Sequence, residues 1–141
     1  MSTDWLAVRA DPIEAVEHGV EAESDLFRSM HTGPRSFDRI DYPLAEVLPE
    51  ETNRLDATNW SHAVRVNLYF ERGRDLDYVE DVLHPVAGVL DSVLTSLGDT
   101  ECTNNYYPET IEDYAGELDN TKLLLVSIRF RVTTLVDPGT F

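Results

Sequence analysis

The sequence VRVNLYFE, residues 64–71, alternates apolar and polar side chains. One set consists of Val64, Val66, Leu68 and Phe70. The other set consists of Arg65, Asn67, Tyr69 and Glu71. Successive side chains of a β-strand point to opposite faces, so this pattern predicts a strand with one face in the core and one face outside it.

The segment that follows, residues 77–98, has the spacing of an amphipathic helix. Asp77 and Glu80 form a capping-box pattern, apolar residues then recur at i, i+3, i+4 and i+7, and Gly98 marks the end. Pro85 lies inside this repeat and has no N–H, so we expect a kink near residues 81–85. The single apolar stripe predicts a helix that lies across one face of a sheet.

Residues 123–135 alternate in the same way as residues 64–71 and predict another strand. Extended at ~3.3 Å per residue it would run ~40 Å, so it must bend at a bulge or project beyond its own domain. Projection would make it an assembly element. Residues 101–107 are expected to pair with it, with an acidic connection over residues 108–121 between the two strands.

The first half of the chain is expected to hold one helix and a strand hairpin. Asp11 and Pro12 have the pattern of a cap and a first helical position, and the helix is expected to end before Gly33. Residues 41–49 predict a strand that pairs with residues 60–70 through a polar connection over residues 50–60.

This order of elements, α-β-β-α-β-β, predicts an α+β fold with two layers. An antiparallel sheet of about four strands would be covered on one face by two helices. We expect a single domain over residues 1–141, with an N-terminal arm (1–11), a core (12–135) and a C-terminal tail (136–141).

The chain is strongly acidic. Its 141 residues include 27 Asp and Glu against 11 Lys and Arg, which gives a net charge of −16 with histidine neutral. Binding to a phosphate backbone requires clustered Lys and Arg, so this surplus argues against nucleic-acid binding and against docking onto anionic lipid.

The basic residues are almost all arginine, and Lys122 is the only lysine. Carboxylates bind water strongly, and guanidinium groups are more weakly hydrated than ammonium groups, so such a surface suits a solvent poor in free water. The pattern resembles the proteins of haloarchaea, which keep molar salt in the cytoplasm. An ordinary acidic protein is the alternative.

The sequence offers no clear set of catalytic, metal-binding or cofactor-binding residues. Cys102 is alone and is followed by no zinc-type cluster, and the four histidines never lie at i, i+3 or i+4. Glycine-rich phosphate loops and the G-x-S-x-G nucleophile pattern are both missing. We therefore expect a protein that is not an enzyme, with no metal and no cofactor.

Arginine and aromatic side chains on the predicted strands point instead to an interaction surface. Both residue types are enriched at protein interfaces. The interface candidates, which include aromatic residues near both ends of the chain, are Trp5, Trp60, Arg65, Tyr69, Arg129, Arg131 and Phe141. The alternative for the strand residues is pairing within the chain, with Glu46 or Glu71.

The order and spacing of four stretches resemble a known family. The stretches are FDRIDYPLAEVLP (37–49), WSHAVRVNLYF (60–70), VEDVLHPVAGVLDSV (79–93) and IEDYAGELDNTKLLLVSIRFRV (111–132). Together they resemble the tail terminator, or tail completion, proteins of long-tailed, non-contractile viruses. The resemblance covers about residues 12–132.

The resemblance implies a structural protein of the virion. Members of that family form a six-membered ring that caps the tail tube, stops its growth and joins the tail to the head connector. The implied partners are further copies of the chain, the tail-tube protein and the neck proteins, and genomic DNA passes through the ring without specific binding. The implied location is the head–tail junction of a tailed virus of a haloarchaeon, after synthesis in the host cytoplasm.

Two alternatives remain. One is another neck protein or minor tail-tube component of the same virion. The other belongs to a different class, a host cytoplasmic α+β domain that binds a small molecule or acts as an enzyme. A concave pocket with convergent polar groups and a perturbed pKa would favour that second alternative.

Overall fold

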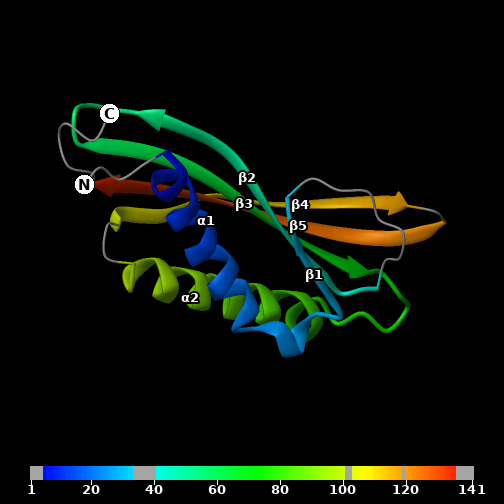
Figure 1. The fold of residues 1–141 in the computed structure, drawn as a ribbon. Coiled ribbons are helices and arrows are strands. Elements are labelled where there is room, and N and C mark those ends of the chain that lie inside the picture. The colour runs from blue at the N-terminus through cyan, green and yellow to red at the C-terminus, as the bar shows by residue number, and fades with distance from the viewer. Residues whose placement is uncertain (1–4, 34–40, 101–102, 119, 136–141) are drawn as a thin grey trace.

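The computed structural model of the protein describes residues 5–33, 41–100, 103–118 and 120–135, with side chains from residue 9 onward (Figure 1). Two α-helices and a short 3₁₀ turn and π-helix are combined with five strands. In chain order the elements are α1 (Trp5–Glu21), η1 (Ser24–Leu26), β1 (Ser29–Thr32), β2 (Leu44–Arg54), β3 (Asn59–Glu71), η2 (Tyr78–Leu83), α2 (His84–Gly98), β4 (Thr103–Leu118) and β5 (Thr121–Leu135).

The strands form one mixed sheet in the order β1-β2-β3-β5-β4. β1 runs parallel to β2, and every other neighbouring pair is antiparallel. The α+β class with two helices is confirmed. The prediction of four antiparallel strands in the order α-β-β-α-β-β is wrong, because β1 adds a fifth, parallel strand.

Both helices lie on one face of the sheet, and the core lies between them and that face (Figure 1). The alternating residues Val64, Val66, Leu68 and Phe70 of β3 are all buried there. The matching residues of β5, Val126, Ile128, Phe130 and Val132, are buried beside them. We call the other side of the sheet the open face, because no described helix covers it.

The first helix differs from its prediction at both ends. It begins at Trp5, before the expected cap at Asp11, and ends at Glu21, so it includes residues that were expected to form an arm. Pro12 therefore lies inside the helix rather than at its first position. Met30, which was expected on the same helix, belongs to β1.

The polar stretch over residues 50–60 forms strand ends rather than a connection. β2 continues to Arg54 and β3 begins at Asn59. The short turn between them is held by Asp56, whose Oδ1 accepts hydrogen bonds from the backbone N–H groups of Thr58 and Asn59, each at 2.8 Å. A carboxylate that bonds to the backbone two or three residues later stabilises a tight turn.

The acidic connection predicted over residues 108–121 is also a strand. β4 runs from Thr103 to Leu118, and a turn containing Asn120, with φ of 66°, leads into β5. β5 pairs along its length with β3 on one side and β4 on the other. The bulge expected within residues 123–135 is not there, because β5 pairs with β3 without a register shift; the shifts lie in β4, between Thr103 and Asn105 and between Pro108 and Thr110.

The second long helix begins as a π-helix. The Asp77 side chain caps it by accepting from the N–H groups of Val79 and Glu80. The carboxylate that bonds back to the Asp77 N–H is Asp81, at 2.9 Å, rather than the predicted Glu80. Near residues 81–85, where a kink was expected, the helix changes from π to α geometry between Leu83 and His84, with Pro85 in the first turn of α2.

The two α-helices cross closely at Gly19. A Cβ atom added there would lie 2.4 Å from the Cα atom of Val93, so α2 approaches the α1 backbone directly. The Ser96 hydroxyl donates to the Ala15 carbonyl at 2.6 Å and ties the helices at the same crossing. No described helix is long and apolar enough to cross a bilayer.

Candidate functional site

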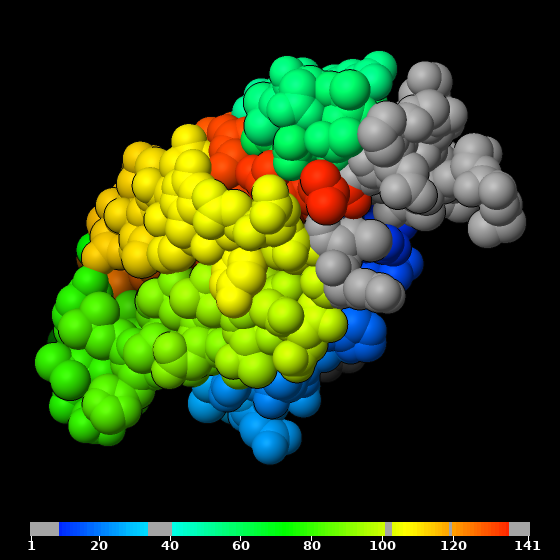
Figure 2. Space-filling view, turned by 90° about the vertical axis from the view of Figure 1, so that its left-hand side faces the viewer, coloured from blue at the N-terminus to red at the C-terminus, as the bar shows by residue number. Residues whose placement is uncertain are grey.

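The most unusual surface is the edge strand β4. It has 16 residues and pairs with β5 alone, so one side of its backbone has no partner strand among the described residues. Figure 2 shows it as a surface band, in yellow, beside α2. None of its described residues is buried.

Large apolar side chains remain exposed along this strand. Their exposed fractions lie between 36% and 49%. The set is Tyr106, Tyr107, Ile111, Tyr114 and Leu118. Large exposed apolar patches mark surfaces that bind other proteins, and these five side chains lie along one strand, between acidic residues.

The register of the β4–β5 pair divides these side chains between the two faces. Ile111 lies opposite the core residue Ile128, and therefore lies on the helix side. Tyr107 and Tyr114 lie opposite Arg131 and Leu125 on the open face. A second strand placed along β4 would meet apolar side chains on both faces.

Tyrosine hydroxyls on and beside β4 are held by carboxylates. The Tyr114 hydroxyl donates to Glu112, and Tyr78 of η2 donates to Asp113. These hydrogen bonds raise the pKa of both tyrosines above its ordinary value, because ionisation would place two negative charges side by side. The described strand holds no Lys or Arg.

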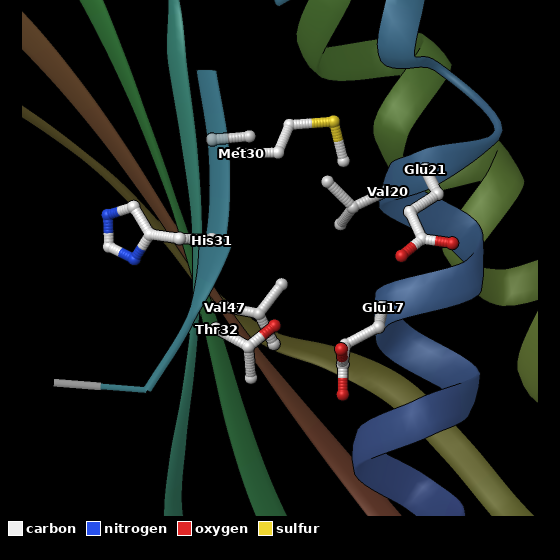
Figure 3. A pocket seen from close by; sticks show the side chains of 8 residues that line it. Glu17, Val20, Glu21, Met30, His31, Thr32 and Val47 are labelled. Atoms are coloured by element: carbon white, nitrogen blue, oxygen red, sulfur yellow. The ribbon is translucent and has the colours of Figure 1, made fainter. Parts of the chain in front are cut away.

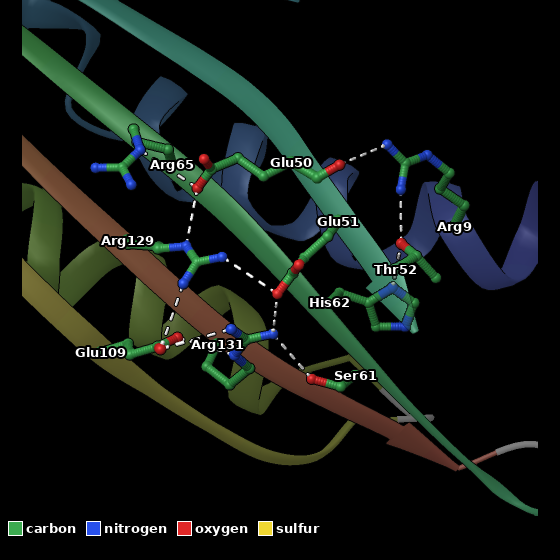
Figure 4. A network of polar contacts seen from close by, with 10 residues as sticks. All are labelled: Arg9, Glu50, Glu51, Thr52, Ser61, His62, Arg65, Glu109, Arg129 and Arg131. Carbon is green, nitrogen blue, oxygen red and sulfur yellow. Dashed lines mark hydrogen bonds and ion pairs between the residues drawn. The ribbon is translucent and has the colours of Figure 1, made fainter. Parts of the chain in front are cut away.

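A second cluster, the arginine network, occupies the open face (Figure 4). It joins three arginines to three glutamates from β2, β3, β4 and β5. Its members are Arg65, Arg129, Arg131, Glu50, Glu51 and Glu109. The bulge between Pro49 and Thr52 lets both consecutive glutamates reach it.

Arg129 and Arg131 each contact glutamates from both β2 and β4. Arg129 Nε lies 3.0 Å from Glu50 Oε1, and its Nη2 lies 3.2 Å from Glu51 Oε1. Arg131 Nε lies 2.8 Å from Glu109 Oε2. The Arg131 hydrogen bonds hold the pKa of Glu51 and of Glu109 below its ordinary value.

The structure places the predicted strand candidates on one face and pairs each of them within the chain. Arg65 donates to Ser127 at 2.8 Å and lies 3.3 Å from Glu50. The Tyr69 hydroxyl donates to Glu46 at 3.0 Å, as the alternative of pairing with Glu46 predicted. Whether these residues also contact another chain stays a prediction.

The aromatic candidates lie elsewhere. Trp60 is half-buried near the start of β3, with the Arg54 guanidinium 6.0 Å from its ring centroid. Trp5 lies in α1, but its side chain lies outside the described residues, as does Phe141. Among the candidates whose side chains are described, the structure brings Arg65, Arg129 and Arg131 together and places Trp60 apart from them.

A partly buried row of hydrogen bonds lies near the start of β3. Arg9 Nη1 donates to Thr52 Oγ1 at 2.6 Å, and the His62 ring lies 3.0 Å from Thr52 Oγ1 and 2.9 Å from Thr134 Oγ1. Burial, with a smaller effect of the nearby Arg9 charge, lowers the pKa of His62 to about 4. The sequence pattern around His62 did not reveal these hydrogen bonds, because the partners of His62 lie on two other strands.

A second buried polar group lies under the open face. His31 Nε2 is 3.7 Å from Glu46 Oε2, and Asn67 and Tyr69 both donate to Glu46 Oε1. Burial raises the pKa of Tyr69 to about 12, and the Glu46 charge adds to this effect. The buried Glu46 carboxylate of β2 thus has polar neighbours from β1 and β3.

The described residues leave several hollows in the surface. Within the described residues, no group of three or more His, Cys, Asp or Glu side chains is placed to hold a metal ion. A groove of about 240 Å³ lies between α1 and β1. A wider hollow of about 540 Å³ lies between η1 and η2, with Arg28 and several carboxylates at its rim.

No protein-family model and no curated protein matches this sequence.

Proposed function

We propose that this chain is a structural subunit that assembles edge to edge with further copies of itself into a closed ring, as the tail terminator at the head–tail junction of a tailed virus. The observation that carries the proposal is the exposed β4 strand. The six-fold count, the tail-tube and connector partners and the halophilic host belong to the same proposal and rest on the sequence resemblance. We expect no catalytic activity.

The physical argument starts from the length of the edge. A strand of 16 residues extends over ~50 Å and presents a row of backbone N–H and C=O groups to any other strand. Monomeric proteins protect such edges with short strands, charged side chains, proline, bulges or covering elements, and β4 has Pro108, two register shifts and several carboxylates. On β4 the edge is long, and apolar side chains flank it on both faces.

The second argument concerns the character of the exposed side chains. Tyrosine provides three of the five exposed apolar residues on β4, and tyrosine is enriched at protein interfaces. The carboxylates between them keep the free subunit soluble. In a ring, the net charge of −16 would leave the lumen without the cations that retain DNA.

The assembly is tested on the purified full chain in molar KCl. Size-exclusion chromatography with light scattering gives the mass, and electron microscopy shows whether the particles are rings. The edge variant Ile111→Lys/Tyr114→Lys places two charges on β4, and we expect it to remain folded and monomeric. The control Leu26→Lys/Leu55→Lys carries the same charges at exposed apolar positions off β4 and should assemble normally.

A wild-type chain that stays monomeric in molar KCl overturns the ring. A control variant that fails as completely as the edge variant shows that added charge, and not the β4 edge, is responsible. Gold-labelled antibody on virions then tests the location: label at the head–tail junction supports a terminator, and label along the tail tube indicates a tube component instead.

A further inference from the structure

The groove between α1 and β1 combines an apolar floor with an acidic wall. Val20, Ala45 and Val47 lie at its base, beside Met30 of β1. Figure 3 shows the carboxylates of Glu17 and Glu21 projecting from α1 toward β1.

The described part of the chain places no lysine or arginine against this wall. Among the described residues that line it, none is Lys or Arg, and the His31 ring points to the opposite face of the sheet (Figure 3). Glu21 lies 3.9 Å from His18 on the outer surface of α1. A guanidinium group on an aliphatic stem suits such a groove, since the stem covers the apolar floor while the head pairs with carboxylates.

The same chain carries an exposed basic corner, which we define as Arg72, Arg74 and Lys122. The Arg72 N–H donates to the Lys122 carbonyl at 2.9 Å, so the two segments are held together. All three side chains are exposed. Within the described part of the chain, none of the three forms an ion pair, although acidic residues far outnumber basic ones.

We propose that the α1–β1 groove receives the basic corner of a second copy of this chain, with Arg72 and Arg74 pairing with Glu17 and Glu21. The spacings agree. Residues 72 and 74 are at most ~7 Å apart along the chain, and glutamates one helical turn apart have Cβ atoms ~6 Å apart. This contact rests on the proposed ring and names a second surface within it.

The position of the two surfaces suits a contact that repeats from copy to copy. The groove borders β1, at one edge of the sheet, and the corner lies where β3 ends and β5 begins, beside the turn from β4 (Figure 1). A neighbour whose β4 approaches the β1 edge brings its basic corner toward the groove. Because two different surfaces meet, the contact is head to tail. Such contacts form a ring where the rotation between copies closes and a filament where it does not, and the proposed ring requires closure.

Charge reversal on the full chain tests the contact. The groove variant is Glu17→Arg/Glu21→Arg, and the corner variant is Arg72→Glu/Arg74→Glu. Each places like charges at the contact, so we expect the ring peak to be lost for each variant alone. The control Glu14→Arg/Asp91→Arg makes the same change in net charge as the groove variant, at exposed positions outside the groove, and should assemble as the wild type does.

Restoration is the decisive readout. The variant with all four substitutions has complementary charges again, so it should regain the ring, and an equal mixture of the groove and corner variants should form alternating rings. If both two-site variants assemble normally, or if the four-site variant folds but stays monomeric, the groove contact is overturned while the ring stands. A wild-type chain that never assembles overturns both proposals.

Discussion

His62 shows how a single polar side chain is kept neutral inside this core. Its ring is almost fully buried between two threonine hydroxyls, which can donate to or accept from a neutral imidazole. A protonated ring would lose hydration and lie close to the positive Arg9. The folded state therefore favours the neutral form of His62.

This preference for the neutral form makes the stability depend on pH. Above pH 6.5 the ring is neutral in both the folded and the unfolded chain. Between pH 6.5 and about 4 the unfolded chain binds a proton that the folded chain does not, so we expect the free energy of unfolding to fall as the pH falls. The total loss is roughly 3 kcal/mol, which is reached below pH 4.

Urea unfolding over this pH range, compared with His62→Gln, measures the effect. The variant should show a smaller pH slope than the wild type, whereas His18→Gln should keep the wild-type slope because His18 is exposed. Equal slopes for wild type and His62→Gln would show that His62 does not provide the dependence.

At the scale of elements, the α1–α2 crossing depends on the lack of a side chain at Gly19. We expect Gly19→Ala to destabilise the fold by about 1–3 kcal/mol, because the new Cβ meets the backbone of Val93. Thermal unfolding measures this loss.

Gly88→Ala is the matched control. A Cβ at Gly88 would lie 3.3 Å from the Glu23 carboxylate, which can move, and 3.7 Å from Leu26 Cδ1, which is an ordinary contact. Alanine favours a helix by about 1 kcal/mol over glycine, so this variant should be neutral or stabilising. Similar losses for both glycine variants would contradict a role for the close crossing.

Elements with one buried face were predicted well from the sequence, and exposed ones were not. β3, β5 and α2 bury one side, and burial selects alternating or helical apolar patterns. Only the start of β4, Thr103 to Tyr107, was predicted as a strand. The rest is exposed on both faces, so nothing selects apolar residues at alternate positions, and its acidic residues indicated a connection. The four-residue β1 is too short to produce a pattern.

The face of the sheet on which the strand candidates lie was predictable from the alternation of apolar and polar residues, but the partners of these residues were not. Alternation placed Arg65, Tyr69, Arg129 and Arg131 on the non-core face, where the structure has them. The partners of the three arginines, Glu50, Glu51 and Glu109, fall in the two stretches that were expected to be connections. A bulge and a long-range strand pairing bring these glutamates to the arginines, and neither leaves a local signal in the sequence.

At the scale of the whole molecule, the net charge of −16 destabilises the folded chain by self-repulsion. The Debye length falls from ~10 Å at 0.1 M salt to ~3 Å at 1 M, so added KCl should screen that repulsion and raise the melting temperature. Salt also weakens the ion pairs of the arginine network. That network is neutral overall, so we expect the screening of repulsion among the surplus carboxylates to be the larger effect.

Thermal unfolding in rising KCl, followed by circular dichroism, measures the effect. The variant Glu112→Gln/Asp113→Asn/Glu117→Gln removes three carboxylates from β4 and should show a weaker salt dependence. A melting temperature that stays constant or falls with KCl would contradict dominant self-repulsion.

The strand order has a consequence for synthesis of the chain. β5 is the last strand in sequence but lies between β3 and β4 in the sheet. Until it leaves the ribosome, β3 has an open side and β4 has no partner, so the nascent chain cannot complete its sheet. The free side of β3 and the unpaired β4 can therefore both pair with wrong strands until translation of β5 is finished. Insertion of β5 between them then pairs both strands in one step.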